Sequence, residues 1–293
     1  MSAGVNAGAS IGAMLDALAT RMAGPDAPPA RQEARDLIAA VLDVPRFWPT
    51  AHRDRGLSSD EAARIEATAE RLARGMPLAY AARRAQFRAL SLYVDERVLI
   101  PRPETELLVE LALAASGERG GLAIDAGTGS GNIALALATE GRFSRVIGTD
   151  VSADAVAVAR ENAARLAPSA GCTVEFLVGE WLVPCLGDEA DVVVSNPPYI
   201  STDEIDELPP DVRDWEPHVA LFAEDGGMAA IAAIAAQAAR VLRPGGVLAL
   251  EVDSRRAGRA AACVEETGAY RDIVVRPDLT GRARFVLARR MEE

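Results

Sequence analysis

The sequence predicts an α/β protein in which helices cover both faces of a mostly parallel sheet, preceded by a small helical domain. After Pro101, short apolar runs alternate with helical segments, a rhythm typical of parallel strands joined by helical crossovers. From Ile11 to about Arg74, apolar residues recur at helical spacing and no strand-like run intervenes. With 293 residues, 49% of them hydrophobic, the chain can build a core for each part.

The N-terminal helices carry local start and stop signals. Residues 36–44, DLIAAVLDV, and residues 61–75, EAARIEATAERLARG, each place an apolar stripe on one helical face. Ser59 and Asp60 can cap the second of these helices and Gly75 can end it. We therefore assign residues 1–85 to an N-terminal helical domain.

Residues 86–100 are expected to form a connector. The stretch FRALSLYVDERVLI alternates apolar and polar residues with Asp95 and Glu96 at a turn, which predicts a β-hairpin. Directly afterwards, Pro103 can occupy the first turn of a helix, with Glu104 and Glu106 favourably placed near its N-terminus.

Residues 101–293 are assigned to the α/β domain. The expected strands are LAIDAG, RVIGTD, TVEFLVG, DVVVSNPP and GGVLALEV, and the expected helices are IALALA, AVAVARENAARL and MAAIAAIAAQAARVL. Two last runs, RDIVVRPD and ARFVLARR, are separated by Leu279, Thr280 and Gly281 and suit a terminal antiparallel hairpin.

Composition excludes several classes of protein. A formal charge of −12 opposes nucleic-acid binding, which Lys and Arg drive by displacing counterions, so we expect no direct nucleic-acid partner. The three cysteines, Cys172, Cys185 and Cys263, are widely spaced without histidine nearby, which predicts neither disulfides nor a metal site. No basic leader or bilayer-length apolar run is present, so we expect a cytoplasmic protein without membrane contact.

A glycine-rich turn marks the expected cofactor site. Residues 122–131, LAIDAGTGSG, read as a buried strand, a turn containing Gly127, Thr128, Gly129, Ser130 and Gly131, and the start of a helix. The third glycine falls one place early for a dinucleotide fingerprint, so NAD is the weaker interpretation. Positions without side chains let the backbone approach an adenosyl and amino-acid group closely.

Asp150, at the end of the next strand, can accept hydrogen bonds from both hydroxyls of a ribose. Alternatively it caps the following helix. Trp181, after the third strand, is placed to stack on adenine, or equally to belong to the core.

The fourth strand delivers Asn196, Pro197, Pro198 and Tyr199 to the same sheet edge, where two prolines force the chain out of the sheet. Asn196 Oδ1 and the Pro197 carbonyl can each accept one hydrogen of a planar NH₂ group, and Tyr199 can lie against it. The pattern therefore predicts a site that binds a planar nitrogen; the alternative is a Pro-Pro turn capped by Asn.

Several motifs resemble the peptide-chain release factor glutamine N5-methyltransferases: residues 98–106 (VLIPRPETE), AGTGSG, SNPPYI, residues 216–221 (EPHVAL) followed by DGG, and GMPLAY. The resemblance covers nearly the whole chain. It implies a class I (Rossmann-like) methyltransferase sheet, and an enzyme that uses S-adenosyl-L-methionine, yielding S-adenosyl-L-homocysteine, to methylate the Gly-Gly-Gln glutamine of bacterial release factors. It also implies substrate recognition by the N-terminal helices, and we expect a monomer.

Carried over by position, the resemblance makes Gly127 to Gly131, Asp150, Trp181 and Asn196 the cofactor contacts, with Asn196 to Tyr199 gripping the glutamine. It also places the IPRPETE segment beside the cofactor cleft. The chain departs from the family at Ala81-Ala82-Arg83, where an apolar pair and a glycine are usual, and at residues 250–256, LEVDSRR. These departures are expected to affect substrate docking and not the chemistry.

Three alternatives remain open at this point. A glutamine methyltransferase of a large-subunit ribosomal protein shares the catalytic core. An adenine-N6 nucleic-acid methyltransferase also uses an Asn-Pro-Pro-aromatic motif, but the acidic chain lacks a basic target-recognition region. A non-catalytic cofactor-binding module is opposed by the intact Asn196 and glycine turn.

Overall fold

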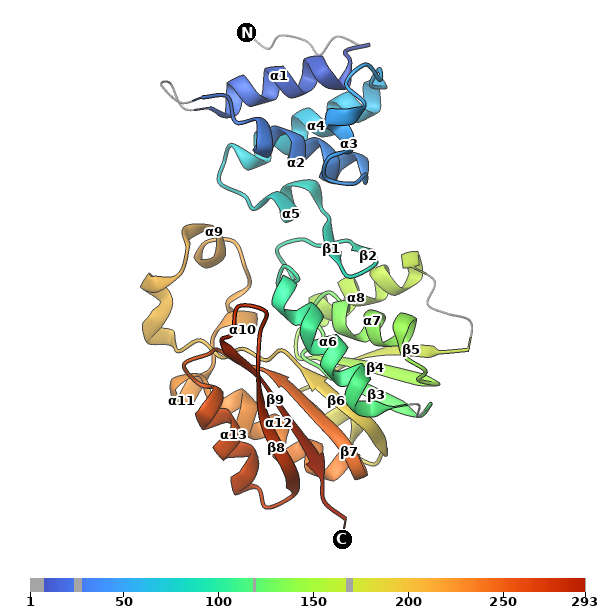
Figure 1. The fold of residues 1–293 in the computed structure, drawn as a ribbon, viewed down its shortest axis with the longest axis vertical. Helices are drawn as coiled ribbons and strands as arrows, with labels where there is room; N and C mark the ends of the chain where they lie inside the picture. Colours follow the sequence, from blue (N-terminus) through green and yellow to red (C-terminus); the bar gives the residue numbers. More distant parts are fainter. Residues whose placement is uncertain (1–7, 24–27, 118–119, 167–170, 293) are drawn as a thin grey trace. The chain divides into compact units, whose positions relative to one another are not determined.

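The computed structural model describes residues 8–23, 28–117, 120–166 and 171–292 (Figure 1). The chain divides into two compact units, residues 1–85 and 86–293, and each is described by itself. Within the described ranges, no helix is both long and apolar enough to cross a membrane. The expectation drawn from the N-terminal sequence rests partly on residues 1–7, which lie outside those ranges.

The first unit is helical, as predicted. Its helices surround a core formed by apolar residues three or four positions apart, among them Leu15, Leu18, Leu37, Ile38 and Ile65, all nearly or fully buried. The helices are α1 (Ile11–Met22), α2 (Arg31–Leu42), α3 (Trp48–Ala51), α4 (Ser59–Leu72) and α5 (Leu78–Ala82).

The cap of α4 differs from the prediction by one residue. Ser58 is the capping residue: its hydroxyl accepts from Glu61 N at 3.2 Å, and the Glu61 carboxylate accepts from Ser58 N at 2.9 Å. Ser59 is already helical. Ser58, Ser59 and Asp60 are all residue types that can cap a helix, and Ser58 does so because Glu61 lies three residues beyond it and completes a capping box. Gly75 N bonds to Leu72 O where the helix ends.

The connector contains a hairpin of β1 (Ala85–Phe87) and β2 (Leu90–Leu92), but its turn is not at Asp95 and Glu96. The chain turns at Arg88, which has φ +53. Arg88 N donates to Glu106 Oε1 at 2.9 Å and its guanidinium pairs with Glu140. These partners come from distant segments, so local sequence could not reveal which turn joins the strands.

The second unit contains a seven-stranded sheet in the order β5-β4-β3-β6-β7-β9-β8. Strands β3 to β7 are parallel, and β9 runs antiparallel to β7 and β8. The strands are β3 (Leu122–Ala126), β4 (Arg145–Asp150), β5 (Thr173–Val178), β6 (Ala190–Ser195), β7 (Leu242–Glu251), β8 (Tyr270–Pro277) and β9 (Ala283–Arg290). The terminal hairpin predicted from RDIVVRPD and ARFVLARR is thus present.

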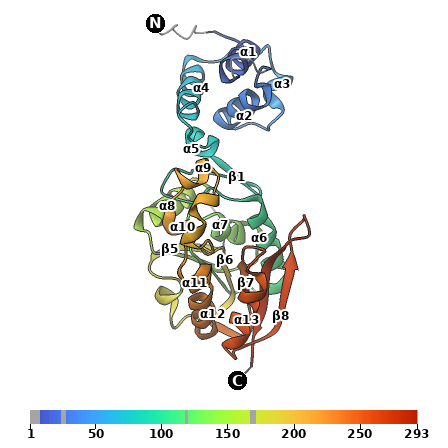
Figure 2. The same ribbon diagram turned by 90° about the vertical axis from the view of Figure 1, so that its left-hand side faces the viewer.

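Helices cover both faces of this sheet, which confirms the predicted fold class (Figures 1 and 2). The main ones are α6 (Pro103–Ser116), α7 (Asn132–Glu140), α8 (Ala153–Leu166), α12 (Ala229–Val241) and α13 (Ala257–Glu266). Shorter helical turns are η1 (Val183–Cys185), η2 (Thr202–Glu207), α9 (Pro210–Arg213), α10 (His218–Leu221) and α11 (Glu224–Gly227). Helix α6 begins with Pro103 and has Glu104 and Glu106 in its first turn, as expected.

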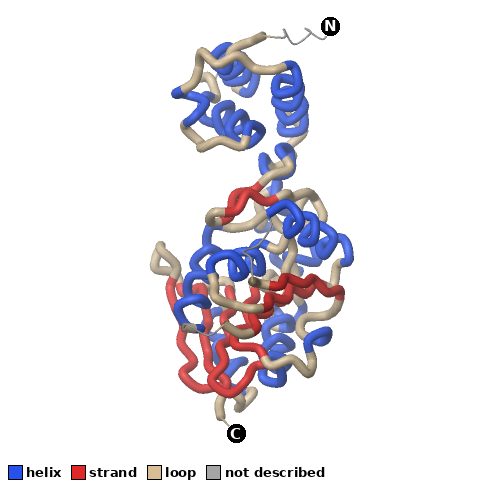
Figure 3. The backbone as a smooth tube through the Cα atoms, turned by 90° about the vertical axis from the view of Figure 1, so that its right-hand side faces the viewer, coloured by secondary structure: helices blue, strands red, loops and turns tan. Residues whose placement is uncertain are grey.

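The order of the strands sets the position of the site. From β3 the chain steps outward through β4 to β5, and it then returns to pair β6 against the other side of β3. Figure 3 shows the strands in red and the helices in blue. Because parallel crossovers are right-handed, this reversal puts α7 and α8 on one face and α12 on the other. The loops after β3, β4 and β6 therefore meet at one edge, where open α/β sheets bind ligands.

Candidate active site

The turn after β3 has the backbone shape that only glycine adopts readily. Gly127, Gly129 and Gly131 have φ of +77, +52 and +82. The amides of Gly127 and Thr128 both donate to the carbonyl of Thr149 on β4, at 2.9 and 2.8 Å. The neighbouring strand therefore holds the turn against the sheet edge.

The glycines of this turn serve different purposes. A Cβ added to Gly129 would meet no atom within 4 Å and would enter a cavity that Gly129 lines. A Cβ on Gly131 would lie 3.2 to 3.3 Å from Ala159, Leu135 and Phe176. Gly129 thus leaves room for a ligand, whereas Gly131 allows the start of α7 to pack closely.

Asp150, the last residue of β4, supports the same turn. Its Oδ2 accepts from Gly129 N and its Oδ1 from Ser152 N, both at 2.9 Å. Burial raises the pKa of this carboxyl, and the two bonds oppose the rise. The helix-cap alternative is wrong, because the Ser152 hydroxyl accepts from Ala155 N in the first turn of α8. Each Asp150 oxygen keeps lone-pair capacity for a ligand.

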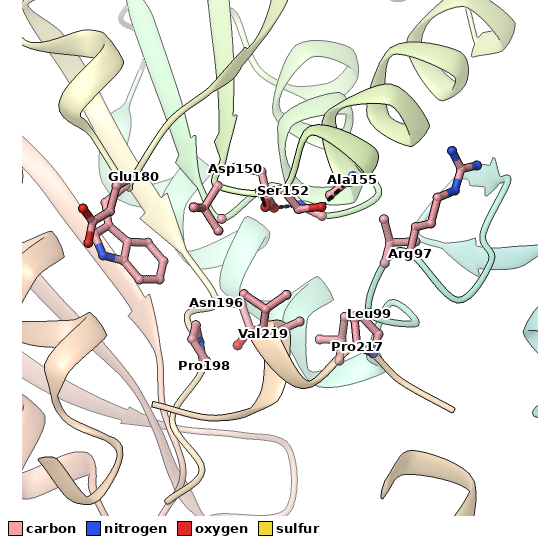
Figure 4. Close-up of a pocket in the computed structure, with 16 residues that line it drawn as sticks. Arg97, Leu99, Asp150, Ser152, Ala155, Glu180, Asn196, Pro198, Pro217 and Val219 are labelled. Carbon is pink, nitrogen blue, oxygen red and sulfur yellow. Dashed lines mark hydrogen bonds between the residues drawn. The ribbon is translucent and has the colours of Figure 1, made fainter. Parts of the chain in front are cut away.

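A cavity lies between these loops, with Asp150 on one side and Asn196 and Pro198 on the other (Figure 4). Most of the residues that line this cavity are apolar. The polar ones are Arg97, Asp150, Ser152, Glu180 and Asn196. The lining residues are Arg97, Val98, Leu99, Gly127, Gly129, Asp150, Val151, Ser152, Ala155, Glu180, Trp181, Asn196, Pro198, Pro217, Val219 and Ala220.

Trp181 lies at the boundary between this cavity and the core. It lines this cavity and also packs against the main core cluster. Its Cζ3 lies 3.6 Å from the position of a Cβ on Gly127, so the indole faces the glycine turn. Its backbone has φ +48, a strained conformation for a bulky residue and one that is enriched at functional sites.

The segment after β6 borders two more cavities. Ser195 Oγ donates to Ala126 O at 2.6 Å, which ties the end of β6 to the end of β3. Asn196 Nδ2 donates to Thr105 Oγ1 at 3.1 Å. Asn196 lines the first cavity, a second one with Pro197, Pro198 and Tyr199, and a third one with Thr128 and Ser130. Gly131 lines none of these three.

Comparison with known proteins places this geometry in a family. Residues 118–272 match the model of a methyltransferase domain, and residues 15–81 match the PrmC N-terminal domain. Proteins named release factor glutamine methyltransferase are similar over nearly their whole length. The chain is 38% identical to that of Cereibacter sphaeroides (94% of this chain, 96% of the relative) and 40% identical to that of Moorella thermoacetica (90% and 92%).

The chain belongs to the release factor glutamine methyltransferase family. This confirms the resemblance seen in the motifs, and it makes the protein a methyltransferase.

Solved structures with low sequence identity share the fold. The hMettl16 catalytic domain, in complex with MAT2A 3′UTR hairpin 1, has a TM-score of 0.56 at 18% identity, covering 88% of this chain and 92% of that one. A methyltransferase from Pyrococcus furiosus has a TM-score of 0.51 at 18% identity, covering 80% of this chain and all of the other.

Two of the family motifs, residues 98–106 and residues 216–221, are in contact, which the sequence did not indicate. Arg102 Nη2 lies 2.6 Å from Glu216 Oε1, and Ile100 N donates to Glu216 Oε2 at 3.4 Å. Burial raises the pKa of Glu216, and Arg102 opposes this. The ion pair therefore holds together two segments that both line the first and second cavities. Pro101, Arg102 and Thr105 line the third cavity.

The departures from the family motifs have structural counterparts. Arg83, where the family usually has glycine, adopts φ +53. Arg256, in the 250–256 departure, donates to Gly226 O at 2.8 Å and pairs with Glu204. The next glycine, Gly227, packs so closely that an added Cβ would lie 2.1 Å from the Tyr199 carbonyl oxygen. This departure therefore lies nearer to the segment from Asn196 to Tyr199 than the sequence predicts.

Asp125 supports the glycine turn from beneath, a role that sequence reasoning missed. It is fully buried on β3, and its Oδ2 accepts from Thr128 Oγ1 at 2.6 Å and Ala134 N at 3.1 Å. Oδ1 is buried with no hydrogen-bond partner among the described residues. The sequence does hold a signal for this role, because Asp125 is an acidic residue inside an otherwise apolar strand, two positions before Gly127. Among the described residues, no group of His, Cys, Asp or Glu is arranged to hold a metal.

Asp125 should make stability depend on pH. Burial raises the pKa of its carboxyl to about 7 in the folded state, against 3.8 as the ordinary value. Between about pH 4 and 7 the folded state then binds a proton that the unfolded state lacks, so the contribution of Asp125 to the free energy of unfolding falls as pH rises. The free energy of unfolding of Asp125→Asn, relative to that of wild type, should therefore increase as pH rises from about 4 to 7. Denaturant unfolding without ligand measures it. A wild-type-to-variant difference that is independent of pH would contradict this account.

Proposed function

We propose that this protein transfers the methyl group of S-adenosyl-L-methionine to the side-chain amide nitrogen of the glutamine in the Gly-Gly-Gln motif of a peptide-chain release factor. One observation carries the proposal. Asn196 lines both a cavity edged by the glycine turn and Asp150 and a second cavity edged by Pro197, Pro198 and Tyr199. A donor and an acceptor bound in the two cavities would meet at Asn196.

The first cavity suits the cofactor. Gly129 leaves open the space that a side chain would fill, and Asp150 presents acceptor oxygens for ribose hydroxyls. Trp181 and Leu99 supply apolar surface for an adenine ring. S-adenosyl-L-methionine, when bound, supplies an electrophilic methyl group on a positively charged sulfur.

The Asn-Pro-Pro-Tyr segment suits the acceptor. An amide nitrogen is a weak nucleophile because its lone pair is delocalised into the carbonyl, so the protein must position it. The oxygens of Asn196 and of the Pro197 carbonyl can each accept one hydrogen of the NH₂ group, which holds the nitrogen in place. The N–CH₃ bond forms as the S–CH₃ bond breaks, and the acidified amide proton then leaves to water. No general base is required.

The names of the relatives support a release factor as the methyl acceptor. The match to the PrmC N-terminal domain supports residues 1–85 as a substrate-recognition domain, followed by the connector at 86–100 and the methyltransferase domain at 101–293. We further infer action as a monomer in the cytoplasm, without nucleic-acid contact, since the net charge is −12.

Transfer of labelled methyl from S-adenosyl-L-methionine tests this function. Purified release factor should be labelled at the Gly-Gly-Gln glutamine, and a factor with that glutamine replaced should stay unlabelled. Ribosomal protein and adenine-containing DNA or RNA serve as competing acceptors. If either competitor is labelled in preference to release factor, the proposed substrate is wrong and that competitor is the methyl acceptor.

Asp150→Ala should weaken cofactor binding by about 1.5–3 kcal/mol, because a charged acceptor for ribose hydroxyls is removed. The same change releases the bonds from Gly129 N and Ser152 N that shape the turn. Isothermal titration calorimetry measures the affinity. A Kd within about twofold of wild type, roughly 0.4 kcal/mol, would exclude the ribose assignment.

Deleting residues 1–85 should leave a domain that binds cofactor with unchanged affinity but methylates folded release factor poorly. Binding energy used away from the reacting atoms contributes to the chemical step as well as to KM. Steady-state kinetics with intact release factor, beside cofactor calorimetry, separates the two effects. Full activity of the truncated enzyme would remove the docking role.

Asn196→Ala should lower kcat by ~10²–10³, the usual cost of losing one preorganised hydrogen-bonding group. Cofactor affinity should fall much less. Asn196→Asp keeps an acceptor oxygen and should retain activity above that of the Ala variant. Single-turnover methylation of release factor measures the step. An Ala variant within about threefold of the wild-type rate, less than ~1 kcal/mol of barrier, would show that Asn196 is not the amide clamp.

A further inference from the structure

A chain of hydrogen bonds runs from Asn196 into the protein interior. Asn196 Nδ2 donates to Thr105 Oγ1 at 3.1 Å, and Thr105 Oγ1 donates to Glu251 Oε2 at 2.7 Å. The three residues follow β6, lie in the first turn of α6, and end β7. Thr105 and Glu251 are each 1% exposed, so water does not compete for the bond between them. The bond from Asn196 to Thr105 is partly buried.

The direction of these bonds follows from the chemistry of the groups. An ionised carboxylate only accepts, so the single hydroxyl proton of Thr105 is used by Glu251. The Thr105 oxygen can then only accept from Asn196. Nδ2 of the planar amide consequently faces Thr105, and Oδ1 is left for the cavities that Asn196 lines.

We propose that Glu251 and Thr105 are positioning residues that orient the Asn196 amide, so that Oδ1 and not Nδ2 meets the NH₂ group of the substrate. The inference rests on the proposed function, since it explains how the acceptor oxygen of that reaction is selected. If the Asn196 amide were rotated by half a turn, its Nδ2 would face the NH₂ group of the substrate. Both groups donate hydrogen bonds, so Asn196 could not hold the glutamine.

The ionisation of Glu251 decides this orientation. A protonated Glu251 can donate to Thr105, whose own proton is then free to bond Asn196 Oδ1 and favour the rotated amide. The charged and titratable groups around Glu251 are Arg284 on β9, Arg102 and Glu104 at the start of α6, and Tyr199 after β6.

These groups compete over the charge on Glu251. Burial is the largest influence and raises the pKa of Glu251 to about 7, with Glu104 adding to it; Thr105, Arg284 and Arg102 oppose the rise. The active orientation should therefore be lost as pH falls through about 7.

The test compares Thr105→Val, Thr105→Ser and Glu251→Gln with wild type in release-factor methylation. Thr105→Val should lower kcat by about tenfold, the factor expected for one hydrogen bond, with cofactor Kd within about threefold. Thr105→Ser, which keeps the hydroxyl, should recover most of kcat. Glu251→Gln should lower kcat and abolish the fall of wild-type kcat below pH about 7, because an amide at this position carries no charge.

Two matched variants control for general effects. Thr267→Val removes a hydroxyl that bonds Val264 O at 2.8 Å, and Glu175→Gln removes a carboxylate paired with Arg145. Both lie away from the site, and kcat and its pH dependence should match wild type. Unchanged kcat and pH profile in Thr105→Val and Glu251→Gln would overturn the positioning role, as would a Thr105→Ser variant as slow as Thr105→Val.

A second readout needs no methyl acceptor. In ¹⁵N-labelled protein, the Asn196 side-chain amide signals are assigned by their loss in Asn196→Ala. Their hydrogen exchange should be slow in wild type and Thr105→Ser and fast in Thr105→Val. If wild type methylates no release factor but shows this protection, the proposed function fails and the positioning role stands. If wild type is active and protection is equal in all variants, the positioning role fails alone.

Discussion

The reversal of strand order between β3 and β6 is the constraint on which the site depends. Because β4 and β6 pair with opposite sides of β3, the loops that follow all three strands open at one edge. Hydrogen bonds then link these loops directly: Thr149 O accepts from the amides of the glycine turn, and the Ser195 hydroxyl donates to Ala126 O. Residues far apart in the chain, such as Gly129, Asp150 and Asn196, therefore face common cavities.

This edge also concentrates buried polar groups. Asp125, Asp150 and Glu251 are all held in surroundings that raise the pKa of their carboxyls, and each accepts hydrogen bonds from nearby backbone or hydroxyl groups. Burying such groups costs free energy that a purely structural core would avoid. Asp125 and Asp150 each accept a bond from the glycine turn, and Glu251 is linked to Asn196 through Thr105. This arrangement suits the proposed reaction, which depends on positioning more than on proton transfer.

Most helices and strands were predicted correctly from the sequence, whereas the hairpin turn of the connector and the cap of α4 were not. The strand-helix rhythm, the terminal hairpin and the glycine-rich turn after β3 were recognisable because periodicity and glycine spacing are local properties. The hairpin turn was misplaced, since Arg88 takes its left-handed backbone against Glu106 and Glu140. The cap of α4 was misplaced by one residue, because three neighbouring residues can all cap and only the bond to Glu61 distinguishes Ser58.

The sequence by itself determined the class of fold, the family resemblance and the residue types that we propose bind an adenosyl group and a planar NH₂ group, because motifs of four to ten residues encode these. Only the tertiary structure decided that Asp150 shapes the turn while Ser152 caps α8, that Arg102 meets Glu216, and that Asn196 is tied through Thr105 to Glu251. Apart from the Ser152 cap, these pairings join residues separated by long stretches of chain, and the direction of a hydrogen bond depends on partners that only folding brings within reach.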